Sequence, residues 1–138
     1  MIRKAEEKDL SYISEIVSVP PFTYDNTPYD VEWLSALIDK GIFLVYESNN
    51  IVKGCIVGEK LLCDGCMLWF LVVDKKYQKS IIGSRLYLKF EQECRNNGIT
   101  WLIAYGFETT EKMLERGGFS TNGSNYKEFF KSLEETNE

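Results

Sequence analysis

The stretch "VVDKKYQKSIIGSRLYLKF", Val72 to Phe90, combines the end of a strand, a polar turn and the start of an amphipathic helix. The helix is indicated by apolar residues at four-residue spacing, namely Ile82, Leu86, Phe90 and Cys94. Backbone amides at a helix start lack intrahelical partners and carry partial positive charge, so such a turn can bind a phosphate. Phosphate loops of this kind usually contain two glycines, whereas only Gly83 is present and Ile81 stands at the place of the first.

Strands are predicted on both sides of this unit. The preceding "MLWFLVV" is apolar without alternation, as expected for a strand buried on both faces. Asp64-Gly65 predicts a tight hairpin turn between "IVGEKLL" and this strand. After the helix, which we expect to end near Asn97-Gly98, "ITWLIAYG" predicts a further central strand.

The remaining elements follow from spacing and turn residues. Met1 to Ala5 predicts an edge strand, and residues 7–18 and 28–41 carry helical stripes, the second with Thr27 as N-cap and Gly41 at its end. "IFLVYES", an Asn49-Asn50 turn and "IVKGCIVGEKLL" predict a hairpin. A short helix over "TTEKMLER" and a last hairpin around Asn122-Gly123 complete the chain. The order β α α β β β α β α β β predicts an α/β fold, with a mixed, mostly antiparallel central sheet and helices on both faces.

Composition limits the class of protein. A length of 138 residues suits a single domain over 1–138, with 134–138 expected to fray, and 44% hydrophobic residues argue against long disorder. No apolar run is long enough for a membrane span and the charged N-terminus has no signal-peptide core, so we expect a cytoplasmic protein with no membrane partner. A net charge of −5 argues against nucleic acid and is compatible with a cationic partner, although solubility alone can explain it. The absence of histidine excludes Ser-His-Asp and Cys-His sites and histidine-ligated metals.

The cysteines predict no metal site. Cys63 and Cys66 form one C-x-x-C, which without a second pair or histidines is a weak zinc signal. We expect them to be reduced cross-strand neighbours at the hairpin tip, with a redox or metal role as the alternatives. Cys94 is expected to be buried in the helix.

Several motifs, in order, resemble those of the GNAT acetyltransferase superfamily. "IRKAEEKDLSYISEI" is similar to its opening strand and helix, and "NNIVKGCIVG" to its second hairpin. The opening stretch resembles the acyl-CoA loop Gln/Arg-x-x-Gly-x-Gly/Ala, here Gln78 to Gly83, and "MLERGGF" resembles the end of its late helix. The resemblance covers nearly the whole chain and implies a GNAT-like acyl-CoA N-acyltransferase fold.

The resemblance implies acetyl-CoA as cosubstrate. It places the pyrophosphate on the loop and the thioester carbonyl on backbone amides of the fourth strand, so the implied cofactor-binding residues are Leu71, Val72, Val73, Gln78, Lys79, Ser80, Ile81, Ile82, Gly83 and Ser84. If Ile81 has ordinary helical dihedrals, its side chain only prevents the phosphate from approaching the backbone closely. We therefore expect the pyrophosphate to bind more weakly or in a displaced position, and not to be lost. An ordinary charged β–α turn is the alternative.

The sequence departs from the family pattern at the position of the general acid, the side chain that protonates the departing thiolate. The position of the family's usual tyrosine is Leu114, and the position of its asparagine before the late helix is Phe107. Tyr105, at the end of a strand, is our candidate acid, and Glu108 just beyond it our candidate base. Each has a structural alternative, packing for Tyr105 and a helix-start charge for Glu108. Glu59 on the hairpin, or a water chain, could also serve as base.

Two functions from different classes therefore remain. The first is an N-acetyltransferase that acts on a primary amine of a small molecule or peptide. The second is a degenerate GNAT domain that binds acyl-CoA or a protein partner without turnover. The aromatic and acidic segment "PPFTYDNTPYD" could enclose a cationic acceptor or simply cover the core. The sequence is also compatible with a homodimer.

Overall fold

The computed structural model describes residues 1–17, 30–78, 81–105, 111–121 and 128–134. These residues form a seven-stranded sheet in the order β1-β2-β3-β4-β5-β7-β6, in which only the β4–β5 pair is parallel. The strands are β1 Ile2–Lys4, β2 Gly41–Ser48, β3 Ile51–Lys60, β4 Gly65–Val73, β5 Trp101–Tyr105, β6 Ser120–Thr121 and β7 Glu128–Ser132. The helices are η1 Glu7–Asp9, α1 Leu10–Ile16, α2 Val31–Lys40, η2 Lys75–Tyr77, α3 Ile82–Asn96 and α4 Glu111–Arg116. The predicted element order and the mixed, mostly antiparallel sheet are confirmed.

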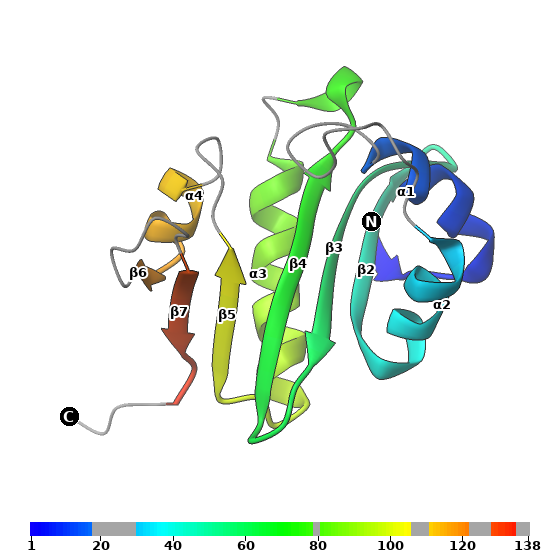
Figure 1. Cartoon of the computed structure of the whole chain (residues 1–138). Helices are drawn as coiled ribbons and strands as arrows, with labels where there is room; N and C mark the ends of the chain where they lie inside the picture. Colours follow the sequence, from blue (N-terminus) through cyan, green and yellow to red (C-terminus); the bar gives the residue numbers. More distant parts are fainter. Residues whose placement is uncertain (18–29, 79–80, 106–110, 122–127, 135–138) are drawn as a thin grey trace.

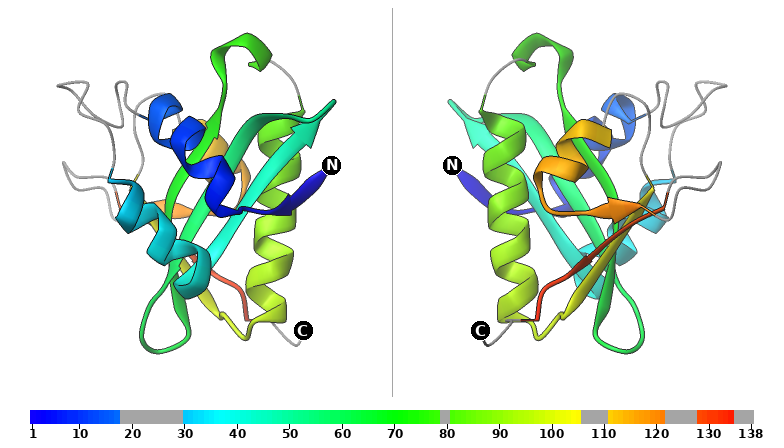
Figure 2. Two further views of the ribbon diagram at one scale, coloured as in Figure 1. Left: turned by 90° about the vertical axis from the view of Figure 1, so that its right-hand side faces the viewer. Right: turned by 90° about the vertical axis from the view of Figure 1, so that its left-hand side faces the viewer.

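Helices lie on both faces of the sheet, as predicted (Figures 1 and 2). α1 and α2 pack on one face over Val45, Val57 and Phe70, and α3 packs on the other. Each face thus has its own hydrophobic core. The predicted apolar stripe of α3 is buried in the core between α3 and the sheet, where Leu86, Phe90 and Cys94 are fully covered. β4 contributes to both cores, which explains why its apolar residues do not alternate with polar ones.

The two central hairpins turn on residues with positive φ. Asn49 and Asn50 have φ values of 53° and 62°, which confirms the predicted turn between β2 and β3. In the β3–β4 hairpin the two turn residues are Cys63 and Asp64, both at φ 60°, and not Asp64-Gly65.

The prediction that Cys63 and Cys66 are cross-strand neighbours is therefore wrong. Cys66 pairs with Lys60, whereas Cys63 is exposed at the tip. A slip of one residue would reverse the facing of every β4 side chain, so burial of the apolar residues selects the observed register. The first residue of β4 must be a glycine, because a Cβ on Gly65 would lie 2.2 Å from the ring of Trp101.

The second helix begins later than predicted. Its N-cap is Asp30, whose carboxylate accepts a hydrogen bond from the amide of Glu32 at 2.9 Å, and not Thr27. A carboxylate caps a helix better than a threonine hydroxyl does, which gives a physical reason. At its other end Gly41 passes directly into β2, where a Cβ would lie 2.0 Å from the carbonyl oxygen of Gly58.

The later elements agree with the prediction. α3 ends at Asn96 and is followed by its C-cap Asn97 and by Gly98, whose φ is +75°, near the predicted end. β6 and β7 form the predicted antiparallel pair, although their turn and residues 135–138 lie outside the described residues. No helix in the described ranges has the length and apolar character to cross a bilayer.

Candidate functional site

β4 and β5 pair over only part of their length. Gly65 to Leu68 pair with Trp101 to Ala104, and β5 ends one residue later. β4 continues to Val73, which still pairs with Gly54 of β3 on its other edge. The last paired residues are Leu68 and Ala104, and the upper part of β4 leans away from β5 (Figure 1). Within the described residues, the edge of β4 from Trp69 onward therefore offers backbone N–H and C=O groups that no strand uses.

A β-bulge marks the point of divergence. Val57 pairs with Phe70 and Gly58 pairs with Leu68, which leaves Trp69 without a partner on β3. Two consecutive side chains, Trp69 and Phe70, consequently contact Trp33 of α2 edge-on, with ring centroids 5.5 and 6.1 Å away. Bulges bend a strand and increase its twist, which accounts for the separation from β5.

The start of α3 lies at the open end of this divergence (Figure 1). Ile81 is the N-cap residue and supplies no side-chain hydrogen bond, and the first turn contains no acidic residue. The Ser84 hydroxyl lies 3.0 Å from the carbonyl oxygen of Ile81, to which it donates a hydrogen bond. The amides of Gly83 and Ser84 precede the first intrahelical bond, from the amide of Arg85 to Ile81. Within the described residues no backbone carbonyl accepts them, so they can donate to an anion.

Ile81 and Gly83 have the conformations that such a site requires. Ile81 has φ −82° and ψ 2°, so its β-branched side chain is not strained, and 57% of its surface is exposed. A Cβ on Gly83 would meet only the Cγ2 atom of Val73, at 3.7 Å. The protein's own packing does not need a glycine there, so the bare backbone leaves room for a ligand.

The turn between β4 and α3 is held by Asp74 and Gln78. One Asp74 oxygen accepts the amide of Lys76 at 3.0 Å, and the other accepts the hydroxyl of Tyr12. The Gln78 side chain donates to the carbonyl oxygen of Val73 at 3.2 Å. The hydrogen bond from Tyr12 lowers the pKa of Asp74 from its ordinary value, whereas burial and the same contact raise that of Tyr12. The turn is thus tied to β4 and to α1.

Positive charge surrounds this turn. Lys53 lies 4.7 Å from the ring centre of Tyr77. Lys75, Lys76 and Arg85 are exposed. The open end of the divergence is therefore basic, although the whole chain is acidic.

The structure brings together eight of the predicted cofactor residues. They lie on the upper half of β4, at the end of η2 and at the start of α3, and are Leu71, Val72, Val73, Gln78, Ile81, Ile82, Gly83 and Ser84. Lys79 and Ser80 lie outside the described residues, as does Glu108. Tyr105 is the last residue of β5 and its backbone pairs with Glu128, but its side chain is not among those described.

Leu114 is buried in the core under α3, with 3% of its surface exposed. A leucine in that position packs and donates no proton.

Glu59 and Trp69 form a pair that the sequence did not indicate. The Trp69 indole N–H donates to Glu59 Oε1 at 2.9 Å, across the strands β3 and β4. The bulge that enables this contact has one sequence signal, the non-alternating "LWFLV", which also fits a regular buried strand.

Comparisons with known proteins agree with this geometry. Residues 10–119 match the model of the acetyltransferase (GNAT) family. Ard1 from Thermoplasma volcanium has a similar structure, with a TM-score of 0.83 and 19% identity over 98% of both chains. YncA from Salmonella typhimurium, solved with its cofactor acetyl-CoA, matches at a TM-score of 0.78 and 18% identity, over 100% of this chain and 96% of its own.

A third similar structure is the PaiA N-acetyltransferase from Thermoplasma acidophilum in complex with coenzyme A. It matches at a TM-score of 0.74 and 18% identity, over 96% of this chain and 98% of its own. At these identities the structural matches show a shared fold. A search of curated proteins found no match.

Proposed function

Because the chain belongs to the acetyltransferase (GNAT) family, we propose that it transfers an acetyl group from acetyl-CoA to a primary amine. The observation that carries this proposal concerns the described residues: an edge of β4 that no strand pairs and a start of α3 without a side-chain cap lie together at one end of the sheet. YncA and the PaiA N-acetyltransferase, which share the fold, were solved with acetyl-CoA and coenzyme A.

The start of α3 is the proposed pyrophosphate site. The amides of Gly83 and Ser84 would donate to phosphate oxygens, and the positive end of the helix dipole would favour the anion. The exposed Lys75, Lys76 and Arg85 add long-range attraction. Ile81 projects into solvent, so it limits close approach without removing a donor.

The edge of β4 is the proposed thioester site. An amide from Leu71 to Val73 would donate to the carbonyl oxygen, which gains negative charge as the amine attacks. Acetyl-CoA supplies an activated acyl carbon and a thiolate leaving group. The C–N bond forms as the C–S bond breaks, one amine proton passes to a base, and the thiolate receives a proton.

We assign Tyr105 as the acid and Glu108 as the base. Tyr105 ends β5 next to the divergence, and Glu108 follows it by three residues. Leu114 is unable to act as the acid, because an aliphatic side chain has no proton to donate. That same observation favours a second candidate function, an acyl-CoA-binding domain without turnover.

The experiment is a calorimetric titration with acetyl-CoA, followed by an assay of coenzyme A release with a panel of amines. We expect micromolar binding of acetyl-CoA and release with at least one amine. Binding without release would favour the second candidate, and a flat titration would overturn both.

Gly83 offers a matched pair of variants for the same titration. Gly83→Asp should abolish acetyl-CoA binding, because it places an anion against the phosphates at the helix start. Gly83→Ala should fold normally, since its Cβ meets only Val73 at 3.7 Å, and should weaken binding far less than Gly83→Asp, because it adds a methyl group but no charge. Equal binding by native and Gly83→Asp proteins would show that α3 holds no phosphate.

A further inference from the structure

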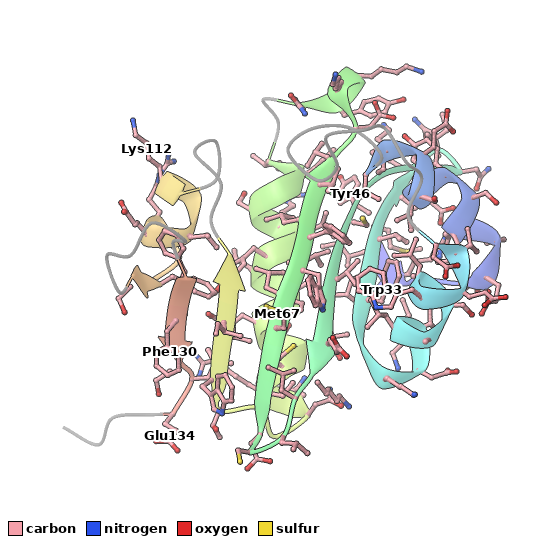
Figure 3. All side chains as sticks on the ribbon, viewed as in Figure 1. Trp33, Tyr46, Met67, Lys112, Phe130 and Glu134 are labelled. Atoms are coloured by element: carbon pink, nitrogen blue, oxygen red, sulfur yellow. The ribbon has the colours of Figure 1, made fainter. Side chains whose placement is uncertain are left out.

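A row of side chains crosses the sheet on the face away from α3. Glu59 of β3 pairs with Met67 of β4, Met67 with Ile103 of β5, and Ile103 with Phe130 of β7. Their chain neighbours Cys66, Leu102 and Phe129 belong to the core under α3, so the row faces the opposite side. Figure 3 shows Met67 and Phe130 on this near face, with α3 behind the sheet.

The row forms an apolar floor that is open to solvent in the described part of the chain. Phe130 is 46% exposed and Trp69, beside the row, is 37% exposed. Trp101 stacks on Phe130 with ring centroids 6.1 Å apart. This floor begins where β4 and β5 diverge, so it adjoins the proposed thioester site.

Glu59 places one carboxylate at the end of this floor. It is half-buried, and its Oε1 atom accepts the Trp69 indole N–H at 2.9 Å. Its partner on β2 is Gly41, which has no side chain. Within the described ranges no lysine or arginine forms an ion pair with Glu59, so its second oxygen is available. A fixed carboxylate beside an indole ring suits an ammonium group.

From this geometry we propose that the acceptor is a diamine, with one amino group at the thioester and the second, as ammonium, at Glu59. The strand rise places Leu71 about 13 Å along β4 from Met67, the partner of Glu59. Because the Glu59 side chain reaches toward Trp69, the two nitrogens should be about 10 Å apart. Trp69, which lies between Met67 and Leu71 on β4 and is 37% exposed, would cover the alkyl chain between them, with the apolar floor beside it. This proposal rests on the proposed acetyl transfer and names its substrate class.

The test compares α,ω-diaminoalkanes of increasing length with monoamines of equal length in the coenzyme A release assay. We expect KM to be about ten-fold or more lower for the longer diamines than for the monoamines. Glu59→Gln keeps an acceptor for Trp69 but removes the charge. It should raise KM for the diamines to the monoamine value, with acetyl-CoA binding unchanged.

Several results would overturn the proposal. An unchanged ratio of diamine to monoamine KM in Glu59→Gln would do so. A loss of kcat with monoamines as well would assign Glu59 as a general base instead. Sedimentation as a dimer that Phe130→Glu dissociates would show that a second copy covers the floor.

A direct binding measurement tests the ammonium site even if the protein transfers no acetyl group. If no amine releases coenzyme A, diaminooctane is titrated calorimetrically into the coenzyme A complex of the native and Glu59→Gln proteins. Binding weakened about ten-fold by Glu59→Gln supports the ammonium site without turnover. Equal binding, or none, rejects it.

Discussion

At the scale of single residues, the position of a cysteine in the fold determines its environment more than its place in a sequence motif does. Cys63 and Cys66 belong to one C-x-x-C, yet Cys63 is exposed at a turn tip while Cys66 is fully buried. Cys66 contacts Cys94 of α3, and the hydrogen bond between their thiols, together with burial, raises the pKa of Cys94. The two cysteines of the motif therefore do not converge on one ligand.

This difference in burial predicts that the same substitution will destabilise the fold at Cys66 and have little effect at Cys63. Cys66→Ser should lower the free energy of unfolding by about 2 kcal/mol, because it buries a hydroxyl among apolar side chains. Cys63→Ser should change it by less than about 0.5 kcal/mol, since the side chain is in solvent. Urea unfolding of the two variants checks this. Equal effects would contradict the described register of β4.

At the scale of elements, Arg3 joins β1, η1 and β2. Its guanidinium donates to both oxygens of Asp9, at 2.8 and 2.9 Å, and its Nε atom donates to Glu47 at 3.0 Å. Asp9 is only 5% exposed and also accepts the amide of Glu6 at 2.8 Å. Burial alone would raise the pKa of Asp9, but the hydrogen bonds from Arg3 and Glu6 outweigh it and lower the pKa below its ordinary value.

This network predicts a pH-dependent loss of stability in Asp9→Asn. The lowered pKa means that the carboxylate stabilises the fold above about pH 4 and loses this effect as pH falls through its folded pKa. The variant should lose about 2 kcal/mol of unfolding free energy at pH 7, and this deficit should shrink below pH 4. Urea unfolding at several pH values measures it.

Lys8→Gln is the control for this prediction. Lys8 lies 3.2 Å from Glu6, but the two side chains are 69% and 58% exposed. Its loss should cost less than about 0.5 kcal/mol. A deficit of Asp9→Asn that stays constant from pH 7 to low pH would show that the charge of Asp9 is not what stabilises these elements.

At the scale of the whole molecule, the divergence of β4 from β5 interrupts a sheet that is otherwise continuous. The unpaired edge of β4 and the uncapped start of α3 both lie at this interruption. A ligand bound there would supply partners that no described residue provides, and a ligand that binds only the folded chain stabilises the entire fold.

Acetyl-CoA should accordingly raise the melting temperature. At about a thousand-fold excess over a micromolar Kd the fold gains about 4 kcal/mol, which corresponds to roughly 10 °C for a domain of this size. Differential scanning fluorimetry with and without acetyl-CoA measures the shift. Gly83→Asp should show none, and a shift equal to that of the native protein would place the ligand elsewhere.

The sequence was sufficient for the order of elements and for the family resemblance. Local periodicity shows which segments are helices and strands, as in the four-residue spacing of α3 and the Asn49-Asn50 turn. The position of Gly83 within the stretch that follows β4 likewise indicated the proposed phosphate site. These features depend on residues close together in the chain, so a local pattern contains the information.

Tertiary structure alone determined the divergence of β4 from β5, the bulge at Trp69 and the contact between Glu59 and Trp69. The same holds for the register that buries Cys66 and exposes Cys63. Each depends on how strands distant in the chain pair, and a one-residue slip leaves the local apolar pattern unchanged while it reverses every side chain. Only the packing of both sheet faces against their helices selects one register, and with it the groups that face the proposed site.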